Sequence, residues 1–245
     1  IGIASSGGAG RVTAEWMING YMNEDLYSLD IKRFQKFHSS KKFIMERVTE
    51  TLGDLYGMHW PYKQHKTSRN QKLLPYHENL KKAGACFGQS GEYERPMWYA
   101  LEDIEPNYDY SFNYQNWYPA VEHECKNTVK NVGLFELSPF SKYEIKGDNA
   151  YEELQRLCTA NIKNEVGKCT YTHMLNESGG IETDLTVVCI DKDYFRIISS
   201  AAVRTHDKAH ILKHLSSEVE FKDVTDDLIC LGIFGPKSRE LLSKI

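Results

Sequence analysis

The spacing of apolar residues changes along the chain from a helical period to a strand period, and this change predicts its secondary structure. Two helices are expected before residue 60. The first covers 11–19 and ends at Gly20, with an apolar side made of Val12, Trp16 and Met17. The second runs from a Ser39 or Ser40 cap to Tyr56, with an apolar stripe made of Ile44, Val48, Leu52 and Leu55.

Beyond residue 140 the apolar residues alternate with polar ones, which is typical of strands with one buried face. The expected elements, in chain order, are a strand over 143–146, a helix over 148–158, strands over 168–175, 182–190 and 194–199, a helix over 203–215, a strand over 228–234 and a last helix from Pro236. The loop 176–180 is that of a β-hairpin by composition. Mixed helices and strands of this kind predict an α+β fold.

Between these two parts lies a stretch rich in aromatic and turn-forming residues. It carries Trp60, Trp98 and Trp117, three rings that are too costly to leave exposed together. We therefore predict ordered, irregular structure there, not a flexible linker. The expected regions are 1–37, 38–119 and 120–245.

Composition narrows the class of protein. The 245 residues carry 30 basic and 34 acidic side chains, giving a formal net charge of -4, so the basic excess of a nucleic-acid-binding protein is missing. No apolar run approaches the roughly 20 residues that span a bilayer. Because the chain begins with Ile1 and not with Met, and its first residues already look structured, we expect it to be an interior piece of a longer protein.

The six cysteines are widely scattered, and none forms a C-x-x-C pair. They are Cys86, Cys125, Cys158, Cys169, Cys189 and Cys230. Scattered cysteines in a chain of this size predict reduced, structural thiols, and the sequence predicts no metal site.

A glycine-rich segment, 5–10, precedes the first predicted helix. We interpret it as a turn whose backbone N–H groups point toward an electron-rich group at the start of the helix. The alternative is a tight strand-to-helix turn that binds nothing.

The predicted hairpin carries a second candidate site. Strand alternation places Asp184 on a face whose other members are largely apolar, with Tyr171 on the neighbouring strand. An Asp on such a face needs a partner or a ligand, and the two side chains are expected within reach of one bound molecule. The alternative is a carboxylate that caps a loop or faces solvent. For Asp207, at the start of the next helix, the helix dipole is sufficient explanation.

These segments also carry a family resemblance. The opening GIASSGGAGRVTAEWMINGYMNEDLYSLDIKRF resembles the end of the flavin domain of dimethylglycine and sarcosine dehydrogenases, and ERPMW resembles their connecting region. GLFELSPFSKYEIKG, YTHMLNESGGIETDLTV and LGIFGPKSRELL are similar to motifs of the aminomethyltransferase-type folate domain, which also occurs in the glycine-cleavage system. The resemblance covers essentially the whole chain.

The resemblance implies roles for particular residues. Asp184 matches the carboxylate that faces the folate N10 and assists one-carbon transfer, and Tyr171 matches a position lining the same pocket. Phe140 and Ile198 match further pterin-side positions. The flavin-contacting segment is matched by Gly2, Ile3, Ala4, Ser5, Ser6 and Gly7. Thr183 replaces the first of two adjacent aspartates that glycine-cleavage relatives usually show, a pattern closer to the dehydrogenases.

The implied activity is oxidative demethylation of dimethylglycine, sarcosine or a similar amine, with FAD and tetrahydrofolate as cofactors and 5,10-methylenetetrahydrofolate as product. The partners expected are small molecules, with no nucleic acid and no membrane, in the cytoplasm of a bacterium or the mitochondrial matrix of a eukaryote. Two alternatives stay open. One is a non-catalytic regulatory protein of the same architecture, similar to the regulatory subunit of pyruvate dehydrogenase phosphatase. The other is a stand-alone aminomethyltransferase.

Overall fold

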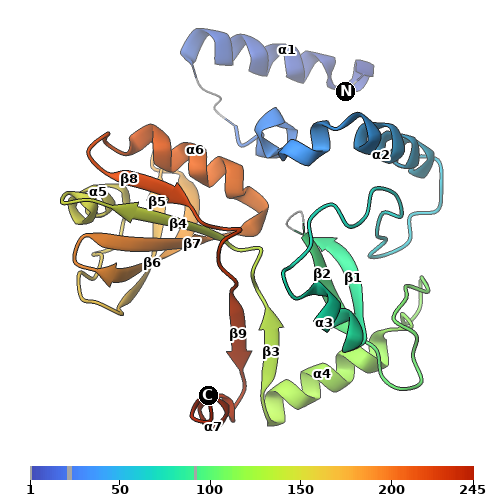
Figure 1. The fold of residues 1–245 in the computed structure, drawn as a ribbon. Coiled ribbons are helices and arrows are strands. Elements are labelled where there is room, and N and C mark those ends of the chain that lie inside the picture. Colours follow the sequence, from blue (N-terminus) through green and yellow to red (C-terminus); the bar gives the residue numbers. More distant parts are fainter. Residues whose placement is uncertain (1, 21–23, 91–92) are drawn as a thin grey trace. The chain divides into compact units, whose positions relative to one another are not determined.

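The computed structural model describes residues 2–20, 24–90 and 93–245. They form two compact units, Ile1–Phe34 and Gln35–Ile245, each described by itself below. The first unit contains helix α1 (Gly2–Asn19) and two 3-10 turns, Tyr27–Leu29 and Ile31–Arg33 (Figure 1).

Helix α1 contradicts the glycine turn predicted over 5–10. The glycine-rich residues continue the same helix that carries Trp16, and none of the residues of α1 is buried. The predicted end of the helix is confirmed. Gly20 has φ +78° and donates its N–H to the Trp16 carbonyl at 2.8 Å, a left-handed helix end that favours glycine.

The second predicted helix is α2 (Lys41–Asp54), which follows a 3-10 turn at Lys36–Ser39. Its cap is confirmed, because the Ser40 side chain accepts a hydrogen bond from the Phe43 N–H at 3.2 Å. The predicted apolar stripe is not buried, since Ile44, Val48, Leu52 and Leu55 are all exposed. The buried residue of α2 is Phe43, whose ring meets that of Phe37 edge-on.

The aromatic-rich stretch is ordered, as predicted. It forms helix α3 (His77–Lys82), the antiparallel hairpin of β1 (Ala85–Ser90) and β2 (Tyr93–Tyr99), and helix α4 (Tyr118–Lys130). Trp98 is only 1% exposed and stacks on Trp117 with 6.3 Å between ring centroids, while Trp60 is half-buried. Ala120 of α4 and Cys86 of β1 complete this small core.

The main sheet has five antiparallel strands in the order β5-β6-β7-β4-β8. The strands are β4 (Ser141–Lys146), β5 (Cys169–Leu175), β6 (Ile181–Asp191), β7 (Tyr194–Ser199) and β8 (Glu220–Asp223). The predicted strands 143–146, 168–175, 182–190 and 194–199 are therefore confirmed. Helices α5 (Ala150–Leu157) and α6 (Arg204–His214) confirm the two predicted helices, and a 3-10 turn, Ala201–Val203, precedes α6.

One face of this sheet is the core of the domain. Val187, Ile197 and Tyr143 lie side by side across β6, β7 and β4, and all three are almost fully buried. Leu154 of α5 and Ile211 of α6 pack in the same core. The two helices thus cover this face, and the residues that alternate with the core residues form the opposite face.

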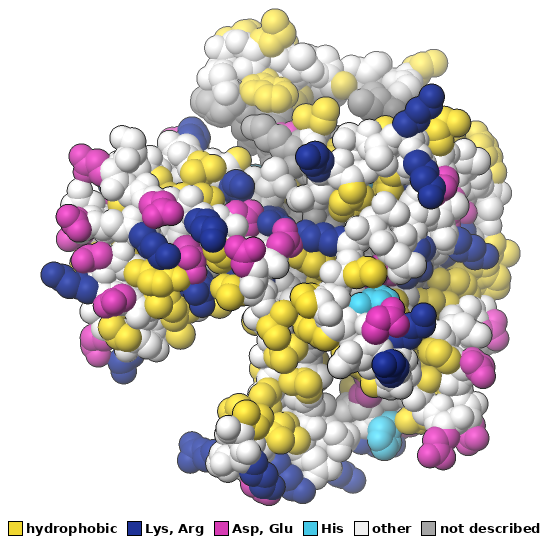
Figure 2. All heavy atoms as spheres, in the orientation of Figure 1, with side chains coloured by type: hydrophobic (Ala, Val, Ile, Leu, Met, Phe, Trp, Pro, Cys, Tyr) yellow, Lys and Arg dark blue, Asp and Glu magenta, His cyan; other side chains and the backbone are white. Residues whose placement is uncertain are grey.

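A second, two-stranded sheet pairs β3 (Gly133–Glu136) with β9 (Leu231–Phe234), and α7 (Ser238–Leu242) follows. Strand β9 and helix α7 are shorter than predicted. Hydrophobic side chains gather on the surface over β3 and β9, as Figure 2 shows. The exposed ones are Leu134, Phe135, Leu231 and Phe234.

Ion pairs and hydrogen bonds join the connecting region, including its hairpin, to the sheet domain. Arg95 Nε lies 3.4 Å from a carboxylate oxygen of Glu136, and Tyr76 donates to the same carboxylate at 2.9 Å. Beside them, Tyr93 and Lys72 both bind Asp226. The match to ERPxW therefore includes an arginine that ties the hairpin to β3.

All six cysteines are free thiols, in agreement with the prediction of reduced cysteines. Cys86, Cys158 and Cys189 are buried, whereas Cys125 and Cys169 are exposed, so a structural, buried role is wrong for these two. Among the helices in the described part of the chain, none combines the length and apolar content that a membrane span requires.

Candidate folate-type site on the open face of the sheet

The hairpin of β5 and β6 brings Tyr171 and Asp184 together as predicted. Tyr171 pairs with Thr186, and His173 pairs with Asp184, so the four side chains share one face. The Tyr171 hydroxyl donates a hydrogen bond to Asp184 Oδ2 at 3.0 Å. The Tyr171 and His173 rings meet edge-on with 5.4 Å between centroids.

The turn of this hairpin is fixed by one side chain. Asn176 Oδ1 accepts hydrogen bonds from the Ser178 and Gly180 N–H groups, at 3.0 and 2.8 Å. The Asn176 amide in turn donates to Glu182 at 3.0 Å. These contacts lock the register that puts Asp184 opposite His173.

Of the two other predicted pterin-side residues, Ile198 lies on this same face. It pairs with Thr186 on one side and with Lys142 on the other. Phe140 directly precedes β4 and is 37% exposed. Its carbonyl accepts a hydrogen bond from Lys142 Nζ at 2.8 Å, which fixes the backbone that carries the Phe140 ring.

The open face carries a negative group, Asp184, on β6 and a buried positive group, Lys142, on β4. The hydrogen bond to the Asp184 carboxylate raises the pKa of Tyr171, so the hydroxyl stays protonated and remains a donor. Lys142 is 3% exposed, and desolvation lowers the pKa of its ammonium. Its Nζ donates to the Ser138 and Phe140 carbonyls, and sequence reasoning missed this buried cation because an exposed lysine has the same alternation pattern.

Asp207 also differs from expectation. A position explained by the helix dipole alone predicts a solvent-facing carboxylate, yet the Asp207 side chain is fully buried. One of its oxygens lies 3.2 Å from His206 Nδ1, and His206 Nε2 lies 3.0 Å from Glu182. The contact joins α6 to the same strand that carries Asp184.

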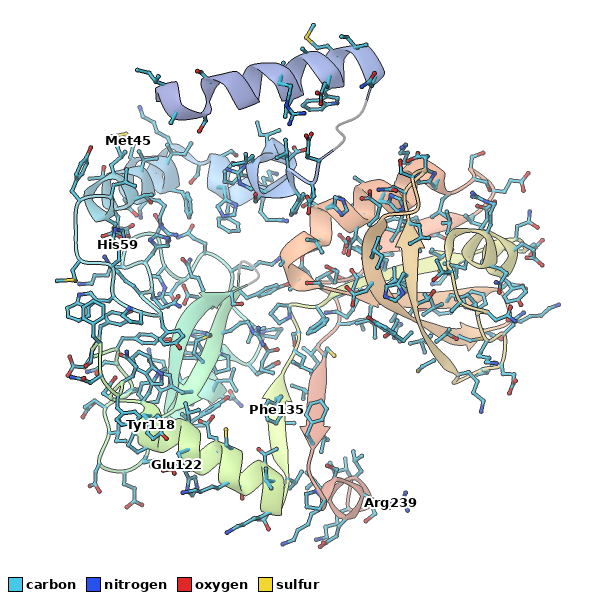
Figure 3. The ribbon with its side chains drawn as sticks, turned by 180° about the vertical axis from the view of Figure 1, so that it is seen from behind. Met45, His59, Tyr118, Glu122, Phe135 and Arg239 are labelled. Carbon is cyan, nitrogen blue, oxygen red and sulfur yellow. The ribbon has the colours of Figure 1, made fainter. Side chains whose placement is uncertain are left out.

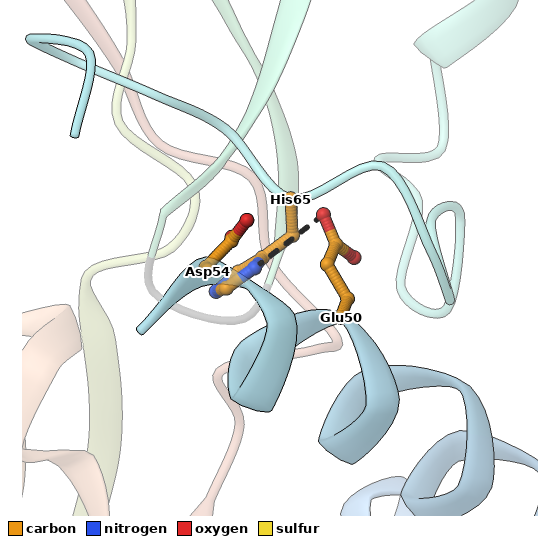
Figure 4. Close-up of side chains that lie close together, drawn as sticks. All are labelled: Glu50, Asp54 and His65. Atoms are coloured by element: carbon orange, nitrogen blue, oxygen red, sulfur yellow. Dashed lines mark ion pairs between the residues drawn. The ribbon is translucent and has the colours of Figure 1, made fainter. Parts of the chain in front are cut away.

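One group of side chains has the composition of a metal site, although none was predicted. Glu50, Asp54 and His65 bring their ligand atoms within 4.8 Å of one another (Figure 4). However, Lys63 Nζ lies 2.5 Å from Asp54, and Glu50 accepts the Lys66 N–H at 2.7 Å. A lysine already supplies the positive charge, so we assign this group to holding the loop after α2 in place.

The described residues suit a folate ring better than they suit FAD. The open face offers a carboxylate, a hydroxyl and the half-buried Ile198, which suit a flat heteroaromatic ring that carries N–H groups. Residues 2–7 lie in an exposed helix and provide no charged side chain, so these six residues do not by themselves form an FAD pocket. Their contact with flavin stays a prediction.

Comparison with known proteins places these features in a family. The family model described as "GCVT N-terminal domain" matches residues 76–245, and that of the "FAD dependent oxidoreductase central domain" matches residues 19–73. The boundary between the two matches falls inside the predicted region 38–119. The predicted boundaries at 37 and 119 stay predictions.

Several curated relatives match the whole chain. Three of them are 4-methylaminobutanoate oxidase (formaldehyde-forming) of Paenarthrobacter nicotinovorans at 38% identity, the mitochondrial pyruvate dehydrogenase phosphatase regulatory subunit of Mus musculus at 32%, and the mitochondrial dimethylglycine dehydrogenase of Rattus norvegicus at 28%. The chain spans only 30%, 29% and 29% of their respective lengths.

Among solved structures, the glycine cleavage system aminomethyltransferase T of Bartonella henselae superposes with a TM-score of 0.58 at 25% identity. The match covers 71% of this chain and 43% of that one. Both comparisons agree with the fold class predicted from the sequence.

Proposed function

Because the chain belongs to the family that joins an FAD dependent oxidoreductase central domain to a GCVT N-terminal domain, we propose that its protein demethylates dimethylglycine, sarcosine or a similar amine and passes the carbon to tetrahydrofolate. The chemistry that FAD supplies when bound is acceptance of a hydride from the N-methyl group. The carbon is then electrophilic, and water would release it as formaldehyde. Capture by a folate nitrogen gives 5,10-methylenetetrahydrofolate instead.

The observation that carries this proposal is the state of the Asp184 carboxylate. Tyr171 holds Oδ2, whereas Oδ1 receives no hydrogen bond from any residue in the described ranges. The side chain is exposed on a face that Ile198 and Val188 make partly apolar. One oxygen is thus oriented and the other is available to a ligand.

This arrangement suits the capture step. When a folate nitrogen attacks the electrophilic carbon, it develops positive charge and must lose a proton. The free oxygen of Asp184 stabilises that charge or accepts the proton, while Tyr171 keeps the carboxylate in one orientation. A ligand placed against the open face gains further from proximity to the carboxylate.

The test is Asp184→Asn in the protein that contains this chain together with its flavin-binding part. Asparagine keeps the size of the side chain and removes its charge. We expect folate-dependent capture to fall about 10²–10⁴-fold, with flavin reduction by the amine unchanged. The measurement pairs the rate of flavin reduction with the partition between methylenetetrahydrofolate and free formaldehyde.

Asp191→Asn is the matched control, because Asp191 is an exposed carboxylate at the far end of the same strand. It should leave the partition unchanged. Undiminished methylenetetrahydrofolate from Asp184→Asn would refute the role of Asp184. A collapse of flavin reduction would refute its assignment to a separate folate site.

The mouse regulatory subunit supports a second candidate, a non-catalytic protein of the same architecture. Flavin reduction by a methylated amine separates the two, since only the demethylase carries it out. The third alternative, a stand-alone aminomethyltransferase, is disfavoured by the oxidoreductase match at residues 19–73.

A further inference from the structure

An aromatic-lined cavity of about 400 Å³ lies in the connecting region, apart from the open face of the main sheet. Its wall contains no charged side chain. The lining residues are Pro61, Tyr62, Phe112, Asn113, Tyr114, Gln115, Trp117, Tyr118 and Val121. Five of these nine residues are aromatic, so the wall offers a ligand mainly ring surfaces.

The rings form the wall as two inclined pairs. Tyr62 and Trp117 stand nearly perpendicular, at 80°, with 6.3 Å between centroids. Tyr114 and Tyr118 lie 4.6 Å apart at 46°. The rings of each pair are inclined and not stacked face to face, and the electron-rich face of an aromatic ring attracts a cation.

The two segments that carry these rings are held before any ligand arrives. The Gln64 N–H donates to the Tyr110 hydroxyl at 2.8 Å and so ties one segment to the other. Gln115 closes the loop that presents Phe112 and Tyr114 by accepting the Ser111 N–H at 3.0 Å.

The backbone of Tyr62 is also unusual. Its φ of +61° lies in the left-handed region, which is costly for a bulky side chain. The left-handed backbone of Tyr62 therefore goes together with a ring that lines the cavity.

The segment that carries Phe112, Tyr114 and Trp117 is acidic, which favours a cation. No Lys or Arg occurs between Tyr99 and Lys126. Besides Glu122, this segment contains four exposed acids, Glu102, Asp103, Glu105 and Asp109, and none of these four has a basic partner within ion-pair distance in the described part of the chain. Glu122 lies one turn after Tyr118 on α4 (Figure 3) and is already paired with Lys126 at 2.7 Å. The four free acids leave an unneutralised negative field that attracts positive ligands.

We propose that this cavity is a binding site for a methylated ammonium cation without a carboxylate. Methyl groups reduce the hydration of the cation, so it enters an uncharged aromatic wall more readily than a bare ammonium does. A carboxylate on the ligand would be repelled by the surrounding acids. The site is independent of the folate-type face and of the demethylation proposed above.

The test uses choline as the probe and 3,3-dimethylbutan-1-ol, its uncharged carbon analogue of the same shape. Binding to the full chain is titrated by saturation-transfer NMR and tryptophan fluorescence at fixed ionic strength. Choline should bind at least about tenfold more tightly than the alcohol, and glycine betaine should bind more weakly than choline. High salt should weaken choline binding but not that of the alcohol.

Two variants locate the site. Phe112→Leu and Tyr114→Leu remove a ring but keep apolar bulk, and both side chains are largely exposed, so folding is spared. Each should weaken choline binding about 3–30-fold. Tyr56→Leu is the control, since Tyr56 is 93% exposed and does not line the cavity.

Equal affinity for choline and the alcohol would overturn the proposal, because the cavity would then be merely apolar. Undiminished choline binding by both leucine variants would also overturn it, as would the failure of choline to bind the unaltered chain. Unchanged circular dichroism of the variants confirms that a loss of binding reflects the missing ring.

Discussion

The hairpin of β5 and β6 and the helix α1 are both predicted to meet a cofactor, but they differ in the contacts that hold them within this chain. The hairpin is part of a five-stranded sheet, and the inward side chains of β6, such as Leu185 and Val187, are almost fully buried. Helix α1 has no buried residue. A site built on a packed element keeps its geometry within the chain itself, whereas a helix without packing depends on something else for its shape.

The largest loss of stability is expected for a substitution in the core of the sheet that carries the hairpin, and it tests the difference between the hairpin and α1. Phe195→Ala removes a fully buried ring from β7 and should lower the free energy of unfolding by about 3–5 kcal/mol. Ile3→Ala in α1 removes a 95% exposed side chain and should change it by less than about 0.5 kcal/mol. Urea denaturation of both variants measures the difference, and equal losses would break the comparison.

A pH-dependent effect is expected on the open face of the same sheet. Desolvation acts to raise the pKa of Glu144, but hydrogen bonds from Tyr194, Arg196 and Lys146 overcome it and lower the pKa to about 2. A carboxyl group with a depressed folded-state pKa stabilises the protein above its unfolded value, near 4.5, and loses that contribution as pH falls toward 2.

The Glu144→Gln variant should therefore lose about 1–3 kcal/mol at pH 6 and almost nothing more as the solution is acidified. The unaltered chain should lose stability between pH 4.5 and 2. Urea midpoints measured at several pH values test this. Parallel pH profiles for the two proteins would mean that Glu144 does not carry the dependence.

Within the site, Tyr171→Phe should have a smaller effect. It removes the hydroxyl that orients Asp184 and leaves the carboxylate itself in place. Solvent screens this exposed hydrogen bond and weakens its effect on the carboxylate, so we expect only a roughly 3–10-fold fall in folate capture. The partition assay measures it, and an effect as large as that of Asp184→Asn would show that Tyr171 acts directly on the ligand.

The smallest effect is expected in α1. A Cβ at Gly7 meets no atom within 4 Å, and alanine favours a helix over glycine by about 0.5–1 kcal/mol. Gly7→Ala should therefore raise the helix content seen by circular dichroism. If the segment forms a flavin-contacting turn in the protein with its flavin-binding part, the same variant would instead weaken flavin retention, and the helix would not be the relevant conformation.

The hairpin could be predicted well from the sequence because its strands are determined by residues that are close together along the chain. Alternation over a few residues decides which side chains share a face, and this was enough to bring Tyr171 and Asp184 together. The same reasoning predicted α2 and its Ser40 cap but failed for the burial of its stripe. Periodicity indicates which side of a helix is apolar, not whether a partner covers that side.

Other features were missed because they depend on the path that a loop takes, which the periodicity of helices and strands does not predict. The group of Glu50, Asp54 and His65 combines a helix with the following loop, and Lys142 is buried only because the loop before β4 folds over its ammonium. The glycine turn failed for the opposite reason. Glycines permit many conformations, so a glycine-rich run does not select a turn without a neighbour that requires one.

The contacts between the connecting hairpin and the sheet domain have a consequence for how the chain unfolds. Tyr93 of β2 binds Asp226 in the turn after β8, and Arg95 of the same strand binds the buried Glu136 of β3. Opening the hairpin alone would leave the buried Glu136 carboxylate without the cation beside it, which is far more costly than breaking an exposed pair. Residues 35–245 should therefore melt in a single cooperative transition, and a protease should find no stable intermediate in which the sheet domain survives without the hairpin.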